Sequence, residues 1–593
     1  MSSLDLWPIG NCQVSALIDR KGDMVWACVP RVDGDPVFSA LLGGEQPSRG
    51  YWTIELDDCS SIEQQYLKNT PILSTRKSDS AGGAIEIIDF CPRFRRLGRD
   101  YRPVAFVRIV RPIQGSPRIC VRLRPTHDWG TDASPLPGGT NHIRYSVSAM
   151  PMRLTTDAPV GLVTAEKTFR LERPLTFFLG PDEGFSADLA QSANEMLSST
   201  VAEWREWVRG LAIPVEWQEA VIRAAITLKL CQHEETGAIV AALTTSIPEH
   251  ADSERNWDYR YCWIRDAYYT VQALNRLGAL DVLESYLSYL RNIVDEAKGG
   301  HIQPLYGVAG EAELAERVEG GLPGYRGMGP VRVGNQAYEQ VQHDAYGQII
   351  LSNVQAFFDH RLFRMATVED FISLEQVGER AWEFHDKPDA GLWELRNRKH
   401  VHTYSAAMCW AACDRLAHAA AALGLADRAH FWQARATAIR EHVEQSAWRE
   451  ELQTMSATLE GDNLDASLIQ LLDLRFFGPG DARFQGTLTA VEEGLRRGAH
   501  MLRYATEDDF GLPETAFNVC TFWLIEALHT TGRESDARAL FEEMLGRRTA
   551  AGLLSEDIDP QSGELWGNYP QTYSLVGMIN CAVLLSKPWS SIR

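Results

Sequence analysis

The segment Ala187–Leu211, ADLAQSANEMLSSTVAEWREWVRGL, divides the chain into two parts that have different hydrophobic periods. The segment itself has the composition and spacing of a connecting helix. Before it, apolar residues alternate with polar ones, as they do along a β-strand. After it, apolar residues recur at three- and four-residue intervals, as they do on amphipathic helices. The change of period predicts a β-rich N-terminal part followed by an α-helical part.

The N-terminal part has the pattern of an antiparallel β-sandwich. In Arg118–Arg124 (RICVRLR), Ile, Val and Leu alternate strictly with Arg and Cys, which is typical of a strand with one buried face. The KGD tripeptide at residues 21–23 lies between two apolar runs and predicts a hairpin. Because Pro and Gly often interrupt the strands, we expect a large sandwich over residues 1–186.

The rest of the chain is predicted to be helical. We expect a helical linker over residues 187–212 and an (α/α)6 barrel over residues 213–593, with long loops at 299–340 and 549–569. An α-solenoid is the alternative architecture, but no 34- or 40-residue repeat supports it. Several predicted helices end at a glycine, which is a common stop signal. The helices are expected at roughly 215–232, 264–278, 280–295, 343–358, 368–385, 404–423, 426–447, 463–473, 483–497, 514–530, 533–547 and 570–585.

Composition restricts the possible partners. The chain has 593 residues, a net charge of −21 and 45% hydrophobic residues. An acidic chain suits neither nucleic acid nor an anionic membrane surface, whereas a neutral polar small molecule fits. The first residues lack the basic and apolar regions of a signal peptide, and no segment is apolar for long enough to cross a membrane. Eleven scattered cysteines without a CxxC pair indicate a reducing compartment, so we expect a cytoplasmic protein.

The segment Asn256–Ala267, NWDYRYCWIRDA, combines aromatic rings with fixed charges just before a predicted helix. A pyranose has a C–H face that packs on an aromatic ring, and its hydroxyls pair with carboxylate and guanidinium groups. The segment therefore suits a sugar. An aromatic cluster at a helix junction, with an Arg–Asp pair that caps the helix, explains this segment alone equally well.

A second segment, Lys387–Asn397 (KPDAGLWELRN), places Glu394 directly after Trp393. Burial beside a tryptophan disfavours the charged form of a carboxyl group, which is the environment that a general acid needs. We expect Glu394 to keep its proton until a leaving group requires it. For a lone glutamate, the commoner interpretation is a helix start that is favoured by the macrodipole.

A third segment, Gly552–Gln571 (GLLSEDIDPQSGELWGNYPQ), contains Glu556 among polar groups. A carboxylate in polar surroundings stays ionised and can act as a base. Trp566 and Tyr569 are expected to add stacking and hydrogen-bonding groups for a substrate. Alone, this segment would be interpreted as a solvated acidic loop. Its combination with the two preceding segments, all in the helical part, favours carbohydrate chemistry.

No metal or cofactor site is expected. His400 and His402 form an HxH pair without a third ligand, so a structural pair is favoured over a metal site. The sequence contains no Walker loop, dinucleotide fingerprint, GxSxG or HExxH motif. The candidate chemistry therefore rests on the side chains of the chain itself.

At these segments the sequence resembles the glucoamylase-like glycoside hydrolases of family 15. The resemblance spans essentially the whole chain: residues 9–43 resemble the β-sandwich of bacterial members, and 256–267, 390–397 and 553–574 match the barrel motifs in order and spacing. The family fold is an (α/α)6 barrel whose inner-helix ends form a pocket for one terminal glucose. The resemblance therefore implies a glycosidase with a β-sandwich and a barrel.

The resemblance also implies roles for individual residues. Glu394 corresponds to the general acid and Glu556 to the general base. Arg265 and Asp266 match the pair that would hold hydroxyls of the glucose, and Tyr259 and Trp263 match aromatic residues that would line its pocket. Trp393 would lie beside the acid. Arg396 differs from the usual residue of fungal relatives and is a candidate contact to the leaving sugar.

The mechanism implied by the family is inverting hydrolysis of an α-glucoside, with release of β-glucose. Inversion needs room for a water, so the two carboxyl groups should lie about 6.5–9.5 Å apart. Candidate substrates are trehalose, isomaltose and malto-oligosaccharides, with a slight preference for trehalose because it suits the expected cytosolic location. The alternatives are a disaccharide phosphorylase with the same domain layout and a non-catalytic carbohydrate-binding protein. The sequence does not indicate an oligomeric state.

Overall fold

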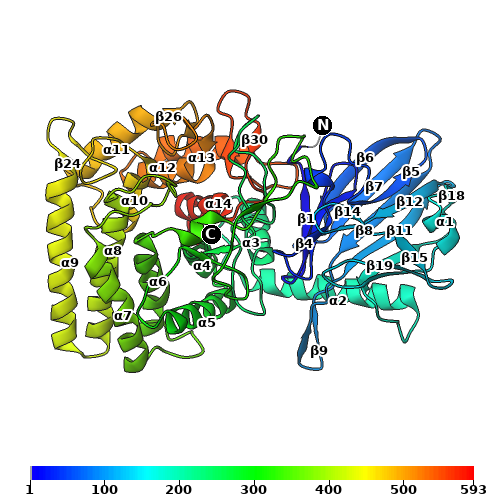
Figure 1. Cartoon of the computed structure of the whole chain (residues 1–593), viewed down its shortest axis with the longest axis horizontal. Helices are drawn as coiled ribbons and strands as arrows, with labels where there is room; N and C mark the ends of the chain where they lie inside the picture. Colours follow the sequence, from blue (N-terminus) through cyan, green and yellow to red (C-terminus); the bar gives the residue numbers. More distant parts are fainter. Residues whose placement is uncertain (1–2, 593) are drawn as a thin grey trace.

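The structure, a computed structural model that describes residues 3–592, places a β-sandwich beside a helical barrel. Figure 1 shows the sandwich in blue and the barrel in green to red, with α2 (Leu189–Arg209) running along the lower side of the sandwich. Loops of the barrel lie against the strands near the N-terminus. This arrangement is the predicted fold class, which is confirmed.

Two antiparallel sheets form the sandwich. The first has the order β1 (Trp7–Gly10), β2 (Ser15–Ile18), β3 (Met24–Val29), β5 (Tyr51–Leu56), β12 (Arg118–Arg124) and β18 (Phe169–Arg170), with β4 (Asp35–Phe38) paired to β3. The second has the order β15 (Pro135–Pro137), β16 (His142–Tyr145), β17 (Met152–Thr156), β19 (Leu175–Pro181), β11 (Phe106–Gln114), β8 (Ala84–Phe90), β7 (Leu73–Asp79) and β6 (Cys59–Tyr66). The short helix α1 (Val160–Thr164) lies between β17 and β18.

Aromatic side chains from the two sheets pack against each other in the sandwich core. The rings of Phe38 and Phe106 are 6.1 Å apart, and those of Trp52 and Phe177 are 6.5 Å apart. In β12 the residues at the predicted inward positions are buried, which agrees with the period of two. The predicted hairpin at residues 21–23 joins β2 to β3.

The linker helix α2 is docked rather than free. The Asp188 side chain accepts a hydrogen bond from the backbone N of Gln191 and caps the helix start. Buried Ala193 packs on apolar residues of the second sheet, and Trp204 packs near α3 (Gln218–Leu230). The helix therefore covers one face of the sandwich and leads the chain to the barrel.

The barrel consists of two concentric layers of helices. The inner layer contains α4 (Ile264–Arg276), α6 (Asp344–Val354), α8 (Thr403–Ala422), α10 (Gln470–Asp473), α12 (Asn518–Thr530) and α14 (Thr572–Leu585). Each of these helices is largely buried. Each contacts its neighbours in the ring directly or through η4 (Ala466–Ile469). The outer layer contains α3, α5 (Leu280–Ala297), α7 (Val368–Phe384), α9 (Ala426–Ala447), α11 (Ala482–Leu495) and α13 (Glu534–Gly546). Each helix range expected from the sequence overlaps one of these helices, although α10 is only a single turn.

Short strand pairs shape the loops at one end of the barrel. They are β20 (Cys262–Trp263) with β21 (Leu305–Tyr306), β22 (Arg317–Val318) with β23 (Arg332–Val333), β24 (Trp448–Arg449) with β25 (Thr454–Met455), β26 (Arg496–Arg497) with β27 (His500–Met501), and β28 (Ala516–Phe517) with β29 (Asp557–Ile558) and β30 (Leu565–Trp566). In the sandwich, β9 (Phe94–Arg96) pairs with β10 (Arg99–Tyr101) and β13 (Thr126–His127) with β14 (Thr131–Asp132). The other 3-10 helices are η1 (Ala40–Leu42), η2 (Gln336–Glu339), η3 (Gln355–Phe357) and η5 (Trp589–Ile592). Between residues 3 and 592, no helix has both the length and the apolar character that a bilayer crossing requires.

Candidate active site

Most of the predicted site residues share one pocket at the N-terminal ends of the inner helices. Loops that lead into α4, α6, α8, α12 and α14 line this pocket. Because a helix N-terminus carries partial positive charge, this end of the barrel suits carboxylates and hydroxyl oxygens. The pocket brings together Tyr259, Trp263, Arg265, Asp266, Trp393, Glu394, Arg396 and Glu556.

The segment 256–267 supplies the central wall of the pocket. Its backbone pairs with residues 241–246, so that the N of Ala242 donates to the O of Tyr259 at 3.0 Å. The chain then continues through β20 into α4, where Trp263 is the N-cap residue. The rings of Tyr259 and Trp263 meet edge to face with centroids 5.4 Å apart, which is a favourable aromatic geometry.

These two rings hold the two candidate catalytic glutamates. The Tyr259 hydroxyl donates to Oε1 of Glu556 at 2.5 Å, and the Trp263 indole N–H donates to Oε1 of Glu394 at 2.6 Å. The glutamates lie 162 residues apart in the sequence (556 − 394). One short segment therefore positions both carboxyl groups in the same pocket.

Glu394 lies on a tight turn and not at a helix start. Its backbone N donates to the O of Gly391 at 3.1 Å, and its φ of 58° lies in the left-handed region, which is uncommon for a residue other than glycine. Gly391 also has a positive φ, and a Cβ there would lie 2.6 Å from the His402 ring. The turn directs the Glu394 side chain, which is 24% exposed, into the pocket, where Nη2 of Arg265 also donates to Oε1 at 3.2 Å.

Glu556 is fixed through its own backbone. Its O accepts from the N of Asn518 at 3.0 Å, and its N donates to the O of Asn568 at 3.3 Å, so it is held from both sides beside β29. Gly567 has a φ of 73°, and a Cβ there would lie 2.7 Å from the Cβ of Glu556. This close approach requires glycine and leaves Glu556 only 2% exposed.

The surroundings of Glu556 are acidic as well as buried. Burial, followed by the nearby carboxylate of Glu249, raises the pKa of Glu556 to about 8, with a further contribution from Asp266. The Tyr259 hydrogen bond and the charge of Arg503 act in the opposite direction. Arg503 itself binds Glu249, with Nη2 2.7 Å from Oε2. A proton is therefore held more tightly at Glu556 than at an ordinary glutamate.

At the floor of the pocket, several buried polar atoms make no hydrogen bond within the protein. Nε of Arg265 and Oδ2 of Asp266 form an ion pair at 3.4 Å but no hydrogen bond, and the hydroxyl of Tyr573 also lacks a hydrogen bond. Burial raises the pKa of Asp266 to about 6, and the Arg265 charge offsets part of that effect. Because buried polar groups are normally paired, these atoms indicate a polar ligand such as a sugar with several hydroxyls.

The mouth of the pocket is built from stacked arginine and aromatic side chains. The guanidinium of Arg396 lies 4.2 Å from the Trp257 ring centroid and 5.7 Å from that of Phe510. Glu316 binds Nη2 of Arg396 at 2.9 Å, and Asp509 accepts from its backbone N at 2.7 Å. Loops from four parts of the barrel thus meet around Arg396.

The structure leaves two predicted site residues outside the pocket. Trp566 lies on β30, where side chains alternate between the two faces, and its ring lies 6.3 Å from that of Tyr325. The Tyr569 hydroxyl donates to the O of Leu6 at 2.7 Å, so this residue packs against the β-sandwich. The structure therefore places both side chains outside this pocket, and their contact with a substrate stays a prediction.

The predicted environments of the two glutamates are also reversed. The sequence predicted a buried Glu394 beside Trp393 and an ionised Glu556 among polar groups. In the structure the indole of Trp393 is directed to Asp465, whose Oδ2 accepts its N–H at 3.0 Å, and Glu394 retains contact with solvent. Glu556 is the buried carboxyl group, and it directly precedes β29, which pairs with β28 on one side and β30 on the other.

Sequence reasoning missed three residues that complete the pocket: Glu249, Arg503 and Tyr573. Glu249 precedes the aromatic segment by only a few residues, and its Oε1 accepts the Trp257 indole N–H at 3.2 Å. Arg503 lies in a loop without a distinctive pattern of aromatic neighbours, so nothing in the local sequence identifies it. Tyr573 follows the third segment directly and could have been found by extending that motif.

No metal-binding cluster is apparent in the part of the chain that the structure describes. Among residues 3–592, no group of three or more His, Cys, Asp or Glu side chains is arranged to hold an ion. His400 and His402 contact each other edge to face with ring centroids 5.9 Å apart. The two carboxyl groups of the pocket can exchange protons with a polar ligand.

Comparisons with known proteins cover the whole architecture. The model of glycosyl hydrolases family 15 matches residues 216–583, and a model of the trehalase-like N-terminal domain matches residues 6–166. A trehalase of Thermoplasma volcanium is 29% identical over 594 residues, with 98% of this chain and 93% of that protein covered. A trehalase of Mycobacterium tuberculosis is 30% identical over 614 residues, with coverages of 97% and 88%.

A solved structure shares the fold. A bacterial glucoamylase complexed with acarbose superposes with a TM-score of 0.69 and covers 98% of this chain and 94% of its own, at 12% sequence identity. At that identity, the superposition supports the arrangement of a β-sandwich and a barrel. The two sequence models match one part of the chain each and together cover both parts. The structural match covers both parts by itself.

Proposed function

This chain belongs to family 15 of the glycosyl hydrolases, and on that premise we propose that it is an inverting trehalase. The protein is a glycoside hydrolase; the substrate and the roles of individual residues are our proposal. The observation that carries it is the pair of hydrogen bonds by which Tyr259 and Trp263 hold Glu556 and Glu394 in one pocket. Two carboxyl groups that flank a bound sugar are what glycosidic hydrolysis requires.

One glucose unit would occupy the floor of the pocket. Asp266 Oδ2 would accept hydrogen bonds from its hydroxyls, and Arg265 Nε would donate to them, which would give hydrogen bonds to two atoms that make none within the protein. The Tyr573 hydroxyl is available for a further bond. The edge-to-face rings of Tyr259 and Trp263 would pack on the apolar face of the sugar.

Glu394 would protonate the glycosidic oxygen, because it lies on the more open side of the site, near the mouth at Arg396. Glu556 would accept a proton from a water on the opposite face of the sugar. That water would donate a hydrogen bond to Glu556, which favours its ionised form and opposes the raised pKa of Glu556. Substrate and water would therefore help to place the proton on the acid and not on the base.

The second glucose would lie at the mouth, between Trp257, Phe510 and Arg396. Arg396 is already held by Glu316 and by both rings, so its guanidinium is a preorganised donor for a hydroxyl of the leaving sugar. Support for trehalose comes from whole-chain relatives that are trehalases and from the trehalase-like N-terminal model. Maltose and isomaltose share the terminal glucose and are the alternatives.

The phosphorylase alternative is disfavoured by charge. A phosphorylase replaces the activated water with a phosphate anion, which needs positive charge on that face of the sugar. Here that face carries Glu556, Glu249 and Asp557, and the nearby Arg503 is already bound to Glu249. Repulsion by these carboxylates supports water as the nucleophile.

We also propose a cytoplasmic location and a small-molecule partner. All eleven cysteines of the chain lie within the described residues, and all are unpaired, with Cys59 exposed and the others buried. Unpaired thiols fit a reducing compartment. A fractionation that found the protein outside the cytoplasm would contradict this location.

A disaccharide panel tests the proposed function. The purified protein is incubated with trehalose, maltose and isomaltose, each with and without inorganic phosphate, and glucose and glucose phosphate are quantified. We expect trehalose to have the highest kcat/KM and glucose to be the sole product in both conditions. Formation of glucose phosphate would establish a phosphorylase, and a preference for maltose or isomaltose would replace the proposed substrate.

A further inference from the structure

Side chains of the segment 257–261 alternate between the active-site pocket and the β-sandwich. The segment pairs with residues 241–246 in an extended conformation, with Ser246 N to Trp257 O at 2.9 Å. In an extended segment, successive side chains point to opposite sides. Tyr259 therefore faces the pocket and binds Glu556, whereas Asp258 and Arg260 face away from it.

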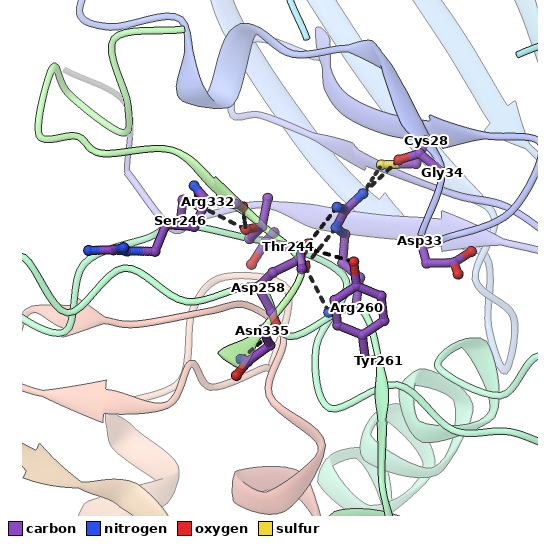
Figure 2. Close-up of polar contacts among 12 residues, drawn as sticks. Cys28, Asp33, Gly34, Thr244, Ser246, Asp258, Arg260, Tyr261, Arg332 and Asn335 are labelled. Atoms are coloured by element: carbon purple, nitrogen blue, oxygen red, sulfur yellow. Dashed lines mark hydrogen bonds and ion pairs between the residues drawn. The ribbon is translucent and has the colours of Figure 1, made fainter. Parts of the chain in front are cut away.

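Arg260 reaches from the barrel toward Cys28 and Gly34 of the sandwich, and its side chain is fully buried (Figure 2). Its Nη1 donates to the O of Gly34 at 2.6 Å and contacts Sγ of Cys28 at 3.4 Å. Its Nε and Nη2 bind Asp258 at 2.9 and 2.7 Å, and its guanidinium lies 5.0 Å from the Trp129 ring centroid. Both Arg260 and Asp258 are 0% exposed.

A second contact joins the sandwich to the same region. The indole N–H of Trp26 donates to the O of Leu243 at 2.8 Å, on the segment that pairs with residues 257–261. The ring of Trp26 also lies 6.4 Å from that of Trp129. Strands of the sandwich thus hold both the segment that carries Tyr259 and the segment that supports it.

A fully buried ion pair is a costly way to gain stability, because desolvation offsets much of the attraction. Such a pair does fix geometry, since a change in either partner leaves a buried charge without its bonds. The position of Arg260, directly after Tyr259, means that a shift of Arg260 moves the residue that holds Glu556. The pair is therefore suited to setting the position of a catalytic group.

We propose that Arg260 is a positioning residue for hydrolysis, through which the N-terminal β-sandwich sets the place of Tyr259 and hence of Glu556. The inference rests on the proposed function only for its kinetic test. It assigns the sandwich a part in catalysis: the sandwich holds one side of the segment whose other side forms the active site. Arg260 itself touches no substrate.

The main test uses Arg260→Lys, which keeps the charge but cannot make the same set of directed bonds. A matched control is Arg108→Lys. Arg108 is also 0% exposed, binds Asp89 at 2.8 Å, donates to two backbone carbonyls and lies 5.3 Å from a tryptophan ring centroid. All of these contacts lie within the sandwich. A second control is Arg93→Lys, which weakens an ion pair with Glu234 between sandwich and barrel, away from the segment. Each variant is assayed well below its own Tm.

We expect Arg260→Lys to lower kcat by about ten- to a hundredfold, with a smaller change in KM, because a small displacement of a catalytic group is costly. The acid limb of its kcat profile should move to higher pH. The Tyr259 hydrogen bond stabilises the ionised form of Glu556, whereas the negative charges of Glu249, Asp266 and Asp557 oppose its ionisation. If that bond is weakened while Arg503 stays in place, the pKa of Glu556 rises. The two control variants should lose thermal stability but keep the kcat and pH profile of the wild type.

Trp129→Phe keeps the proposal testable if Arg260→Lys does not fold. This change lies entirely in the sandwich and weakens the ring contact with Arg260. We expect a smaller fall in kcat with the same direction of pH shift. A folded Arg260→Lys or Trp129→Phe protein with wild-type kcat and pH profile would overturn the proposal, and so would an equal loss of kcat in Arg108→Lys.

Amide hydrogen exchange separates this proposal from the proposed function. Arg260→Lys should exchange faster than wild type in residues 256–263 and 555–568, whereas Arg108→Lys should not. If the wild-type protein hydrolyses no α-glucoside, the proposed function has failed, but this exchange pattern would still support the positioning link. Unchanged exchange in both segments would overturn the link whatever the substrate.

Discussion

The two glutamates that we propose as acid and base are held by the same short segment but lie in opposite surroundings. Glu394 is on a strained turn near the mouth of the pocket and accepts hydrogen bonds from Trp263 and Arg265. Glu556 is buried between short strands and accepts one from Tyr259, with Glu249 and Asp557 close by. In the proposed mechanism the acid, Glu394, faces the leaving group on the open side, and the base, Glu556, would hold the attacking water on the enclosed side.

In the proposed mechanism, position, and not burial alone, assigns the roles of acid and base. Burial raises the pKa of Glu556, which by itself would favour a proton on that residue. In the proposed complex, the glycosidic oxygen is an acceptor that faces Glu394, and a water is a donor that faces Glu556. The bound sugar and water then supply the interactions that separate an acid from a base.

The largest expected effects come from neutralising each glutamate in turn. Glu556→Gln should lose about 10²–10⁴-fold in kcat on trehalose and remain impaired on α-glucosyl fluoride, because water still has to be activated. Glu394→Gln should lose a similar factor on trehalose but retain much more activity on the fluoride, whose leaving group needs no proton. Initial rates on both substrates provide the measurement.

Azide provides a control for these roles. It should restore turnover to Glu556→Ala by entering the vacated face, and it should not restore Glu394→Gln. If Glu556→Gln kept the fluoride reaction and Glu394→Gln lost it, the two roles would be exchanged. The open carboxyl group, Glu394, would then be the base, and the enclosed one, Glu556, would be the acid.

Asp266→Asn tests the floor that both glutamates share. We expect a loss of about a hundredfold in kcat/KM, which is roughly 2.7 kcal/mol of transition-state stabilisation, with an unchanged circular dichroism spectrum. Asp266 would lose the charge that strengthens its bonds to sugar hydroxyls. A folded variant with near-normal kcat/KM would show that Asp266 has only a structural role in α4.

Tyr259→Phe tests the hydrogen bond on the enclosed side. Its loss should reduce kcat about tenfold, because a bond to a charged group is removed. The acid limb of the pH–rate profile should move to higher pH, since the Tyr259 bond lowers the pKa of Glu556. Unchanged kcat and an unchanged limb would show that Glu556 does not depend on Tyr259.

Glu249→Gln should have the smallest effect and the opposite sign. It removes a negative charge that raises the pKa of Glu556 and releases Arg503 from its partner. The acid limb should therefore move to lower pH, by on the order of one unit, which corresponds to about 1.4 kcal/mol. A shift in the same direction as Tyr259→Phe would contradict this description of the acidic surroundings.

Much of the fold follows from local patterns in the sequence. The alternation in β12 and the three- and four-residue spacing of helices such as α5 and α7 depend on which face each residue buries, and that information is local. The single-turn α10 is the exception. Its expected range, 463–473, is divided between an extended residue, Asp465, the 3-10 helix η4 and α10.

The site was less predictable because its details depend on contacts between distant segments. The sequence singled out Glu394 and Glu556 by the aromatic and polar residues next to them. It could not show which short strands would pack around Glu556 and bury it. Trp566 and Tyr569 belong to the same motif as Glu556, yet strand alternation and docking against Leu6 direct them elsewhere. Motif membership therefore located the pocket but not the direction of each side chain.

The anomeric form of the first products tests the central claim most directly. Trehalose joins two α-glucose units, so inversion by a water held at Glu556 releases one β-glucose from the attacked unit and one α-glucose as the leaving group. Proton NMR of the early reaction, before mutarotation, should show the two anomers in equal amounts. In ¹⁸O-labelled water the label should enter the β-anomer alone. Early release of α-glucose only would mean retention and would contradict the role of Glu556 as a base.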